Sequence, residues 1–130
     1  MAKLSIQDII AKKEDCKNRK KIKKCLIHSE FLGGELEAHS LSKEDLADVR
    51  VRLRDEGEEG VYHFIFLSID ELRDPELKKA FSCKRGIDIV DRLFSDAEKA
   101  MIVDILSELN GLTSLDENAI LKMEIEDLKN

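Results

Sequence analysis

The sequence is poor in residues that interrupt helices and strands. It has one proline, six glycines and no tryptophan, and aromatic residues make up 5% of its 130 residues. So few turn formers predict fairly long elements, and the scarcity of aromatic residues is unlike a β-sandwich. The length suffices for one hydrophobic core. Because 38% of the residues are charged, helices with charged outer faces are favoured.

Long apolar runs and paired cysteines are also missing. No stretch approaches the roughly 20 apolar residues of a membrane span, and no signal-peptide pattern opens the chain. The three cysteines are an odd set without paired spacing, which indicates reduced thiols. The sequence therefore predicts a cytoplasmic protein with no membrane partner.

Charge is distributed unevenly along the chain. The net charge is −6, yet residues 11–24 carry eight Lys or Arg against two acids. The remaining residues are therefore strongly acidic, which argues against a dedicated nucleic-acid-binding protein. The basic segment is interpreted as a solvated helix, with an electrostatic arm for a partner as the alternative.

The N-terminal half predicts a helix, a hairpin and a second helix. Ser5 and Asp8 have capping-box spacing and start a basic helix over residues 5–22. Ile6, Ile9 and Ile10 share a face that we expect to dock on the core, and lysines at positions 13 and 17 end that stripe. Gly33 and Gly34 predict a two-residue turn in a hairpin over residues 23–41.

The rest of the chain predicts a helical body over residues 42–111. Its first helix starts at Ser42, and residues 54–60 are expected to form a loop. The apolar run at residues 61–72 is either a buried strand or a buried helix, which periodicity does not separate. Ser95 and Glu98 have capping-box spacing and start the clearest helix, and Asn110 and Gly111 end it. Residues 113–130 predict an acidic tail or a weak helix.

The single proline belongs to a structural motif. Asp74 is a good N-cap and Pro75 suits the first helical turn. Leu77 and Phe81, four residues apart, are expected to point inward, and Cys83 is interpreted as a small buried hydrophobe. The motif predicts a corner of the fold and no active site.

Candidate chemistry is sparse. Cys25 and His28 have ligand spacing, but a structural zinc site needs a second pair. No glycine-flanked nucleophile, phosphate-binding loop or dinucleotide fingerprint is present, and His63 is interpreted as a satisfied core histidine. The basic segment has no interleaved aromatic residues for base stacking. We therefore predict no catalytic, metal or cofactor site, and a protein that binds other proteins through helices.

The order of these features resembles the XkdN-like tail assembly chaperones of phages and PBSX-type prophages. In that family a lysine-rich N-terminal segment precedes a P-x-L-x-x-A-[FY]-x-C motif, matched here by Pro75, Leu77, Ala80, Phe81 and Cys83. An acidic and apolar segment follows, matched by Asp88, Ile89, Val90, Leu93, Phe94 and Glu98. The resemblance runs nearly end to end and is loose only over residues 36–60.

The resemblance implies a fold and a function. It implies an α+β, predominantly helical protein, with an N-terminal helix and small hairpin before a helical body in one domain over residues 1–112. We therefore favour a helix for residues 61–72. The implied function is to bind the tape measure protein and keep it soluble until the tail tube polymerises, with the chaperone absent from the mature tail.

Partner-binding candidates follow from surplus apolar positions. A cover for a long amphipathic helix needs apolar contact surface and enough charge to keep the complex in solution. The candidates are Met101, Val103, Ile120, Met123 and Ile125. Alternatively, these residues complete the protein's own core or a homo-oligomer interface. The alternative function is a small interaction or regulatory module whose basic helix contacts nucleic acid.

Overall fold

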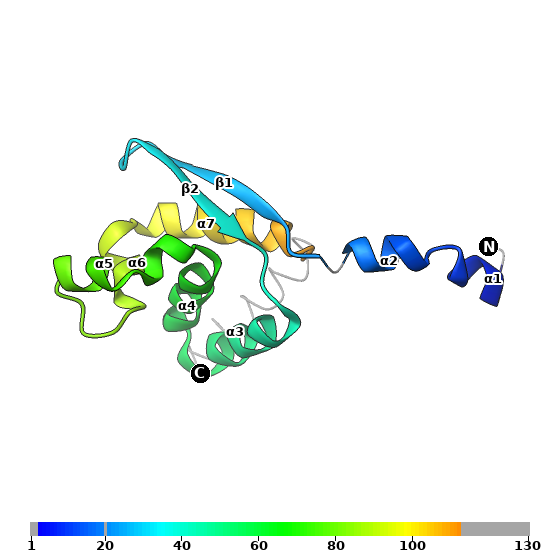
Figure 1. Ribbon diagram of the computed structural model, residues 1–130. Coiled ribbons are helices and arrows are strands. Elements are labelled where there is room, and N and C mark those ends of the chain that lie inside the picture. Colours follow the sequence, from blue (N-terminus) through cyan, green and yellow to red (C-terminus); the bar gives the residue numbers. More distant parts are fainter. Residues whose placement is uncertain (1–2, 20, 113–130) are drawn as a thin grey trace.

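The computed structural model describes residues 3–19 and 21–112. Two short helices lead into a β-hairpin, and a body of five α-helices and one 3₁₀ helix follows (Figure 1). The fold is α+β and predominantly helical, as predicted. The hairpin lies along α7 (Asp96–Leu109), and α4 (Glu58–Ser68) packs against α3 (Lys43–Glu56), α6 (Asp88–Leu93) and α7.

The N-terminal segment forms two helices where the sequence predicted one. Helix α1 (Ile6–Ile10) starts with the predicted capping box of Ser5 and Asp8, and α2 (Lys13–Arg19) follows after a turn. Neither contains a buried residue, and together they project from the body (Figure 1). The expected docking of the isoleucine face is therefore wrong: Ile6, Ile9 and Ile10 remain 72%, 59% and 57% exposed. The stripe stops after two turns, so the segment offers too little apolar surface to hold it against the body.

The predicted hairpin is present, but its turn differs. Strand β1 (Lys24–Ser29) pairs antiparallel with β2 (Gly34–His39), with Ile27 opposite Leu36 and Cys25 opposite Ala38. The connecting loop spans residues 30–33, and only Gly33 has positive φ, at 76°; Gly34 already pairs with Ser29. The predicted two-residue turn at these glycines was therefore wrong. Ile27 and Ala38 are buried toward the helices.

Helices α3 and α4 form a tight pair. Ser42 caps α3 as predicted, accepting a hydrogen bond from the N–H of Asp45. The predicted loop over residues 54–60 is wrong, because α3 continues to Glu56 and α4 starts at Glu58, with only Gly57 (φ 62°) between them. The helix favoured for the apolar run is confirmed: α4 continues to Ser68 and buries Phe64 and Ile65.

The proline motif forms the corner that follows. The 3₁₀ helix η1 (Asp70–Arg73) leads to α5 (Pro75–Ala80), and Asp74 caps α5 through the N–H of Glu76. The helix ends in a Schellman motif: Cys83 N–H donates to the carbonyl of Lys78 at 3.0 Å, and Ser82 takes a φ of 53°.

This ending decides which side chains of the motif are buried. Cys83 follows the left-handed residue and turns into the core, at 9% exposure, while Leu77 packs against the core from its edge. Phe81 sits on the last helical turn and is 37% exposed, so the prediction that it points inward was wrong.

The core is centred on α4, α6 and α7. Its most deeply buried side chains include Ile65, Ile89, Ile102 and Leu106. Helix α7 starts with the predicted capping box of Ser95 and Glu98 and ends at the predicted Asn110 and Gly111. Asn110 also accepts a hydrogen bond from the N–H of Leu41 at 2.8 Å, which ties the end of α7 to the chain after the hairpin.

Candidate protein-binding surfaces

The residues with metal or nucleophile chemistry do not converge. Cys25 and His28 are three residues apart on β1, so they point to opposite faces of the strand. No group of three or more potential metal ligands occurs among the residues that the structure describes. Burial raises the pKa of the Cys25 thiol, which keeps it protonated and unreactive near neutral pH.

Two histidines connect elements of the body. His39 Nε2 lies 2.8 Å from Asp70 Oδ1, which joins the hairpin to η1. His63 Nε2 lies 3.1 Å from Asp48 Oδ2, which joins α4 to α3. The prediction of a satisfied core histidine therefore holds for one ring nitrogen of His63 only, because its Nδ1 is buried without a hydrogen-bond partner in the described part of the chain. Both contacts hold elements of the fold together.

Lys99 is a buried cation at the edge of an open groove. Only 5% of it is exposed, and its ammonium lies 2.9 Å from Asp91, 3.0 Å from Asp96 and 3.8 Å from Glu58. It also lies 4.6 Å from the centre of the Tyr62 ring. Burial acts to lower the pKa of Lys99, but the hydrogen bonds to Asp91 and Asp96 outweigh it and raise that pKa. Lys99 therefore stays charged and joins α4, α6 and α7.

Tyr62 completes this cluster. Its hydroxyl donates to Glu58 at 2.7 Å, and the Lys99 ammonium donates to the same hydroxyl at 3.3 Å. Burial, together with the hydrogen bond to Glu58, raises the pKa of Tyr62 to about 12. The phenol is therefore neutral at physiological pH and acts as a fixed donor.

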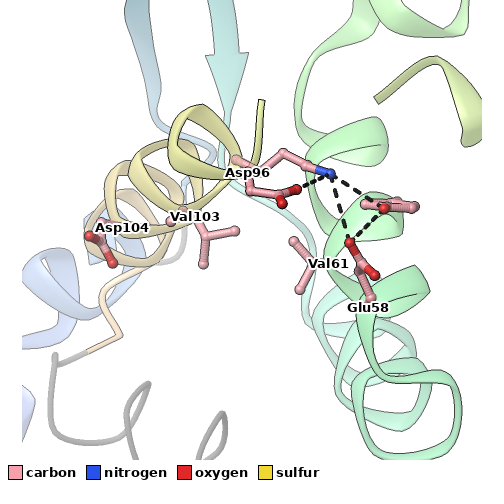
Figure 2. Close-up of a pocket in the computed structure, with 8 residues that line it drawn as sticks. Glu58, Val61, Asp96, Val103 and Asp104 are labelled. Atoms are coloured by element: carbon pink, nitrogen blue, oxygen red, sulfur yellow. Dashed lines mark hydrogen bonds and ion pairs between the residues drawn. The ribbon is translucent and has the colours of Figure 1, made fainter. Parts of the chain in front are cut away.

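The groove itself runs between α4 and α7 and encloses about 280 Å³. Figure 2 shows Val61 of α4 and Val103 of α7 facing each other across it, with Glu58, Asp96 and Asp104 around it. Ala100 adds to the apolar floor. We call this the α4–α7 groove: an apolar floor with an acidic rim.

A second surface covers the N-terminal third of the chain. Of the eleven large apolar residues that are exposed in the described chain, eight lie between residues 4 and 32: Leu4, Ile6, Ile9, Ile10, Ile22, Leu26, Phe31 and Leu32. Single exposed apolar residues are ordinary, but eight of them in this part of the chain make it a candidate region for binding other proteins. The first four lie on or beside α1, and the last three lie on the hairpin.

Basic residues accompany the apolar ones on the N-terminal arm, which we define as residues 3–19. One shallow, open hollow of about 420 Å³ is lined by Ile9, Ile10 and Cys16 together with Lys13 and Lys17. The arm's ion pairs are exposed and long, as between Lys12 and Asp15 at 3.6 Å. Such pairs add little to stability. The arm thus combines apolar and positive character.

The partner-binding residues predicted from the sequence are not brought together. Met101 is 48% exposed on α7, whereas Val103 is 7% exposed, belongs to the core and lines the α4–α7 groove. Ile120, Met123 and Ile125 lie outside the described residues. Sequence reasoning missed the arm as an apolar surface. The signal was the interruption of its isoleucine stripe by Lys13 and Lys17, which left nothing to hold the stripe on the core.

No helix of the described chain has the length and apolar character needed to cross a membrane. Comparisons of the chain with models of protein families, with curated proteins and with solved structures find no match. The likeness to tail assembly chaperones, which rests on the order of short motifs, therefore stays a prediction. What these features together describe is a helical body that carries an apolar, basic arm.

Proposed function

We propose that this protein is a cytoplasmic tail assembly chaperone of the phage type. It binds the tape measure protein and keeps that long helical protein soluble until tail tube subunits polymerise around it, and it is absent from the finished tail. The observation that carries the proposal is the concentration of exposed apolar side chains in the N-terminal third. This surface is suited to cover the apolar stripe of another helix.

The shape of this surface suits reversible binding. The exposed residues are spread over α1, the segment before β1 and the hairpin, so the contact consists of many small patches. A chaperone that must be displaced by the tail tube needs contacts of this kind rather than one deep pocket. Helices of five and seven residues are marginal by themselves in water, so the arm gains order from whatever it binds.

Co-expression with a tape measure protein from the same genome tests the proposal. We expect the tape measure protein to become soluble and to co-elute with several copies of this protein. Replacing Ile6 and Ile9 by serine is expected to reduce the co-eluting amount at least tenfold. The matched control replaces Val51 and Phe81, which are 43% and 37% exposed on the body, by serine. This control should leave the solubility of the tape measure protein unchanged. A tape measure protein that stays insoluble with the wild-type chain would refute the function.

A nucleic-acid-binding module is the second candidate. All described basic residues between positions 12 and 24 are exposed: Lys12, Lys13, Lys17, Arg19, Lys21, Lys23 and Lys24. A salt series separates the two functions, because a duplex held by about five phosphate contacts loses affinity steeply as salt rises. A DNA affinity that is undetectable, or that does not change from 50 to 200 mM salt, would reject the nucleic-acid-binding function.

A further inference from the structure

The N-terminal arm and the α4–α7 groove are complementary in charge. The groove is lined by three carboxylates, Glu58, Asp96 and Asp104, against one ammonium, Lys99. That ammonium is already engaged by Asp91 and Asp96 at 2.9 and 3.0 Å. The rim therefore presents negative charge to the solvent above an apolar floor.

The arm surface has the opposite composition. Ile9, Ile10 and Cys16 are flanked by Lys13 and Lys17, and no acid lines that surface. Lys13 has no ion pair among the described residues, and Lys17 has only the exposed contact with Glu14 at 3.8 Å. The arm therefore offers apolar side chains between two available ammonium groups.

We propose that the arm of one copy docks in the α4–α7 groove of a second copy of this chain. Ile9 and Ile10 cover Val61, Ala100 and Val103. Lys13 approaches Asp104, and Lys17 approaches Glu58. The contact joins two different surfaces, the arm and the groove, so two copies can exchange arms or further copies can add. Association of this kind continues into open chains or closes into a ring. The inference concerns this protein alone and is tested without the tape measure protein, although both proposed contacts use Ile9 and would compete for it.

Two features favour a second copy over other occupants. The arm extends away from its own body, including α4 and α7 (Figure 1), so its apolar face is presented to other molecules. Residues 113–130 have five acids and two lysines, so their net charge has the same sign as the groove rim. Like charges oppose docking of that segment.

Sedimentation of the purified full-length chain at concentrations from 1 to 200 µM tests the contact. We expect concentration-dependent association that weakens between 0.1 and 0.5 M salt, because the charges at the rim are screened. Ala100→Arg places a bulky cation on the groove floor and is expected to abolish association. Ala97→Arg is the matched control: this alanine is also exposed on α7 but does not line the groove, and association should be unchanged. Circular dichroism checks that both variants fold.

A mixture of two variants shows whether the arm binds the groove of another copy or folds back onto the groove of its own chain. Ala100→Arg keeps a working arm, and the double variant Ile9→Asp with Ile10→Asp keeps a working groove. Each should be monomeric alone, and the mixture should form dimers and nothing larger. In a second test, Lys13→Glu should weaken association roughly tenfold, and adding Asp104→Lys should restore it by reversing the pair.

Several results would overturn the proposal. A wild-type chain that remains monomeric at 200 µM rules out the contact. Equal association of the Ala100→Arg and Ala97→Arg variants places the interface elsewhere. If a chain ending at Leu112 associates at least tenfold more tightly than the full chain, residues 113–130 occupy the groove instead. Loss of tape measure binding alone leaves these results unchanged, so the two proposals fail separately.

Discussion

Helices α1 and α7 begin with the same local arrangement. In each, a serine side chain accepts the N–H of the third helical residue, whose acidic side chain reaches back to the serine N–H: Ser5 with Asp8, and Ser95 with Glu98. Yet α1 has five residues and buries none of them, whereas α7 has fourteen and buries five. The same start therefore leads to an exposed arm in one case and to the centre of the core in the other.

The difference shows what a cap does and what packing does. A capping box satisfies backbone donors and defines where a helix begins, at a gain of about 1 kcal/mol. Most helical stability in a protein comes from burying an apolar face. In α7, Ile102 and Leu106 are buried against the rest of the core. In α1, Ile6 and Ile9 remain exposed. Three substitution pairs test this contrast between arm and body, and a fourth tests close packing within the body.

The largest effect is expected for core truncation. Ile65→Ala removes a side chain with no exposure from α4 and should lower the free energy of unfolding by about 2–5 kcal/mol, because it leaves a cavity. Ile9→Ala makes a comparable truncation on the arm and should change the free energy of unfolding by less than about 0.5 kcal/mol. Urea denaturation measures both. Similar losses for the two variants would show that the arm belongs to the cooperative core.

Close helix packing gives the next largest effect. A Cβ added at Gly60 would lie 2.5 Å from the backbone nitrogen of Leu53, so Gly60→Ala must push α3 and α4 apart. We expect a loss of about 1–3 kcal/mol, measured by thermal and urea unfolding. Gly34→Ala in the hairpin is the control, because nothing lies within 4 Å of its added Cβ. A neutral Gly60→Ala variant would contradict the tight α3–α4 contact.

The Lys99 cluster makes a pH-dependent contribution to the free energy of unfolding. Lys99→Met should cost about 1–2 kcal/mol near pH 7, because Asp91 and Asp96 lose their shared cation. Lys12→Met on the arm removes only an exposed pair and should have no measurable effect.

The pH dependence follows from Asp91. The hydrogen bond from Lys99 holds the pKa of the Asp91 carboxyl below its usual value. The stabilisation by Asp91 is therefore present above the unfolded pKa of about 4 and is lost as pH falls through the folded pKa. The stability difference between wild type and Lys99→Met should shrink below about pH 4, as measured by urea denaturation from pH 7 to 2.5. A constant difference would show that Lys99 contributes through packing alone.

The smallest effects come from the caps themselves. Ser95→Ala should lower global stability by about 1 kcal/mol, because the N–H of Glu98 loses its acceptor. Ser5→Ala removes the equivalent cap from α1 and should leave the unfolding midpoint unchanged, with only a small loss of helical circular dichroism. An equal shift of the midpoint in both variants would mean that arm and body unfold together.

Much of the fold could be read from local patterns, and the errors have physical causes. The caps at Ser42, Asp74 and Ser95 were predicted correctly, since each depends on a few neighbouring residues. The loop predicted at residues 54–60 was wrong because acidic residues and glycine are common in loops, whereas here a single glycine joins two helices. The binding surfaces were harder to predict, since exposure depends on what packs nearby.

The sequence by itself determined where helices start, which segment forms a hairpin and where positive charge gathers. Hydrogen bonds to neighbouring backbone groups and the order of charged residues are local properties, so they can be read along the chain. Only the tertiary structure decided that Val103 is buried while Phe81, Met101 and the isoleucines of α1 are exposed. The reason is that burial depends on surfaces contributed by distant segments, and α1 has no such surface in its own body.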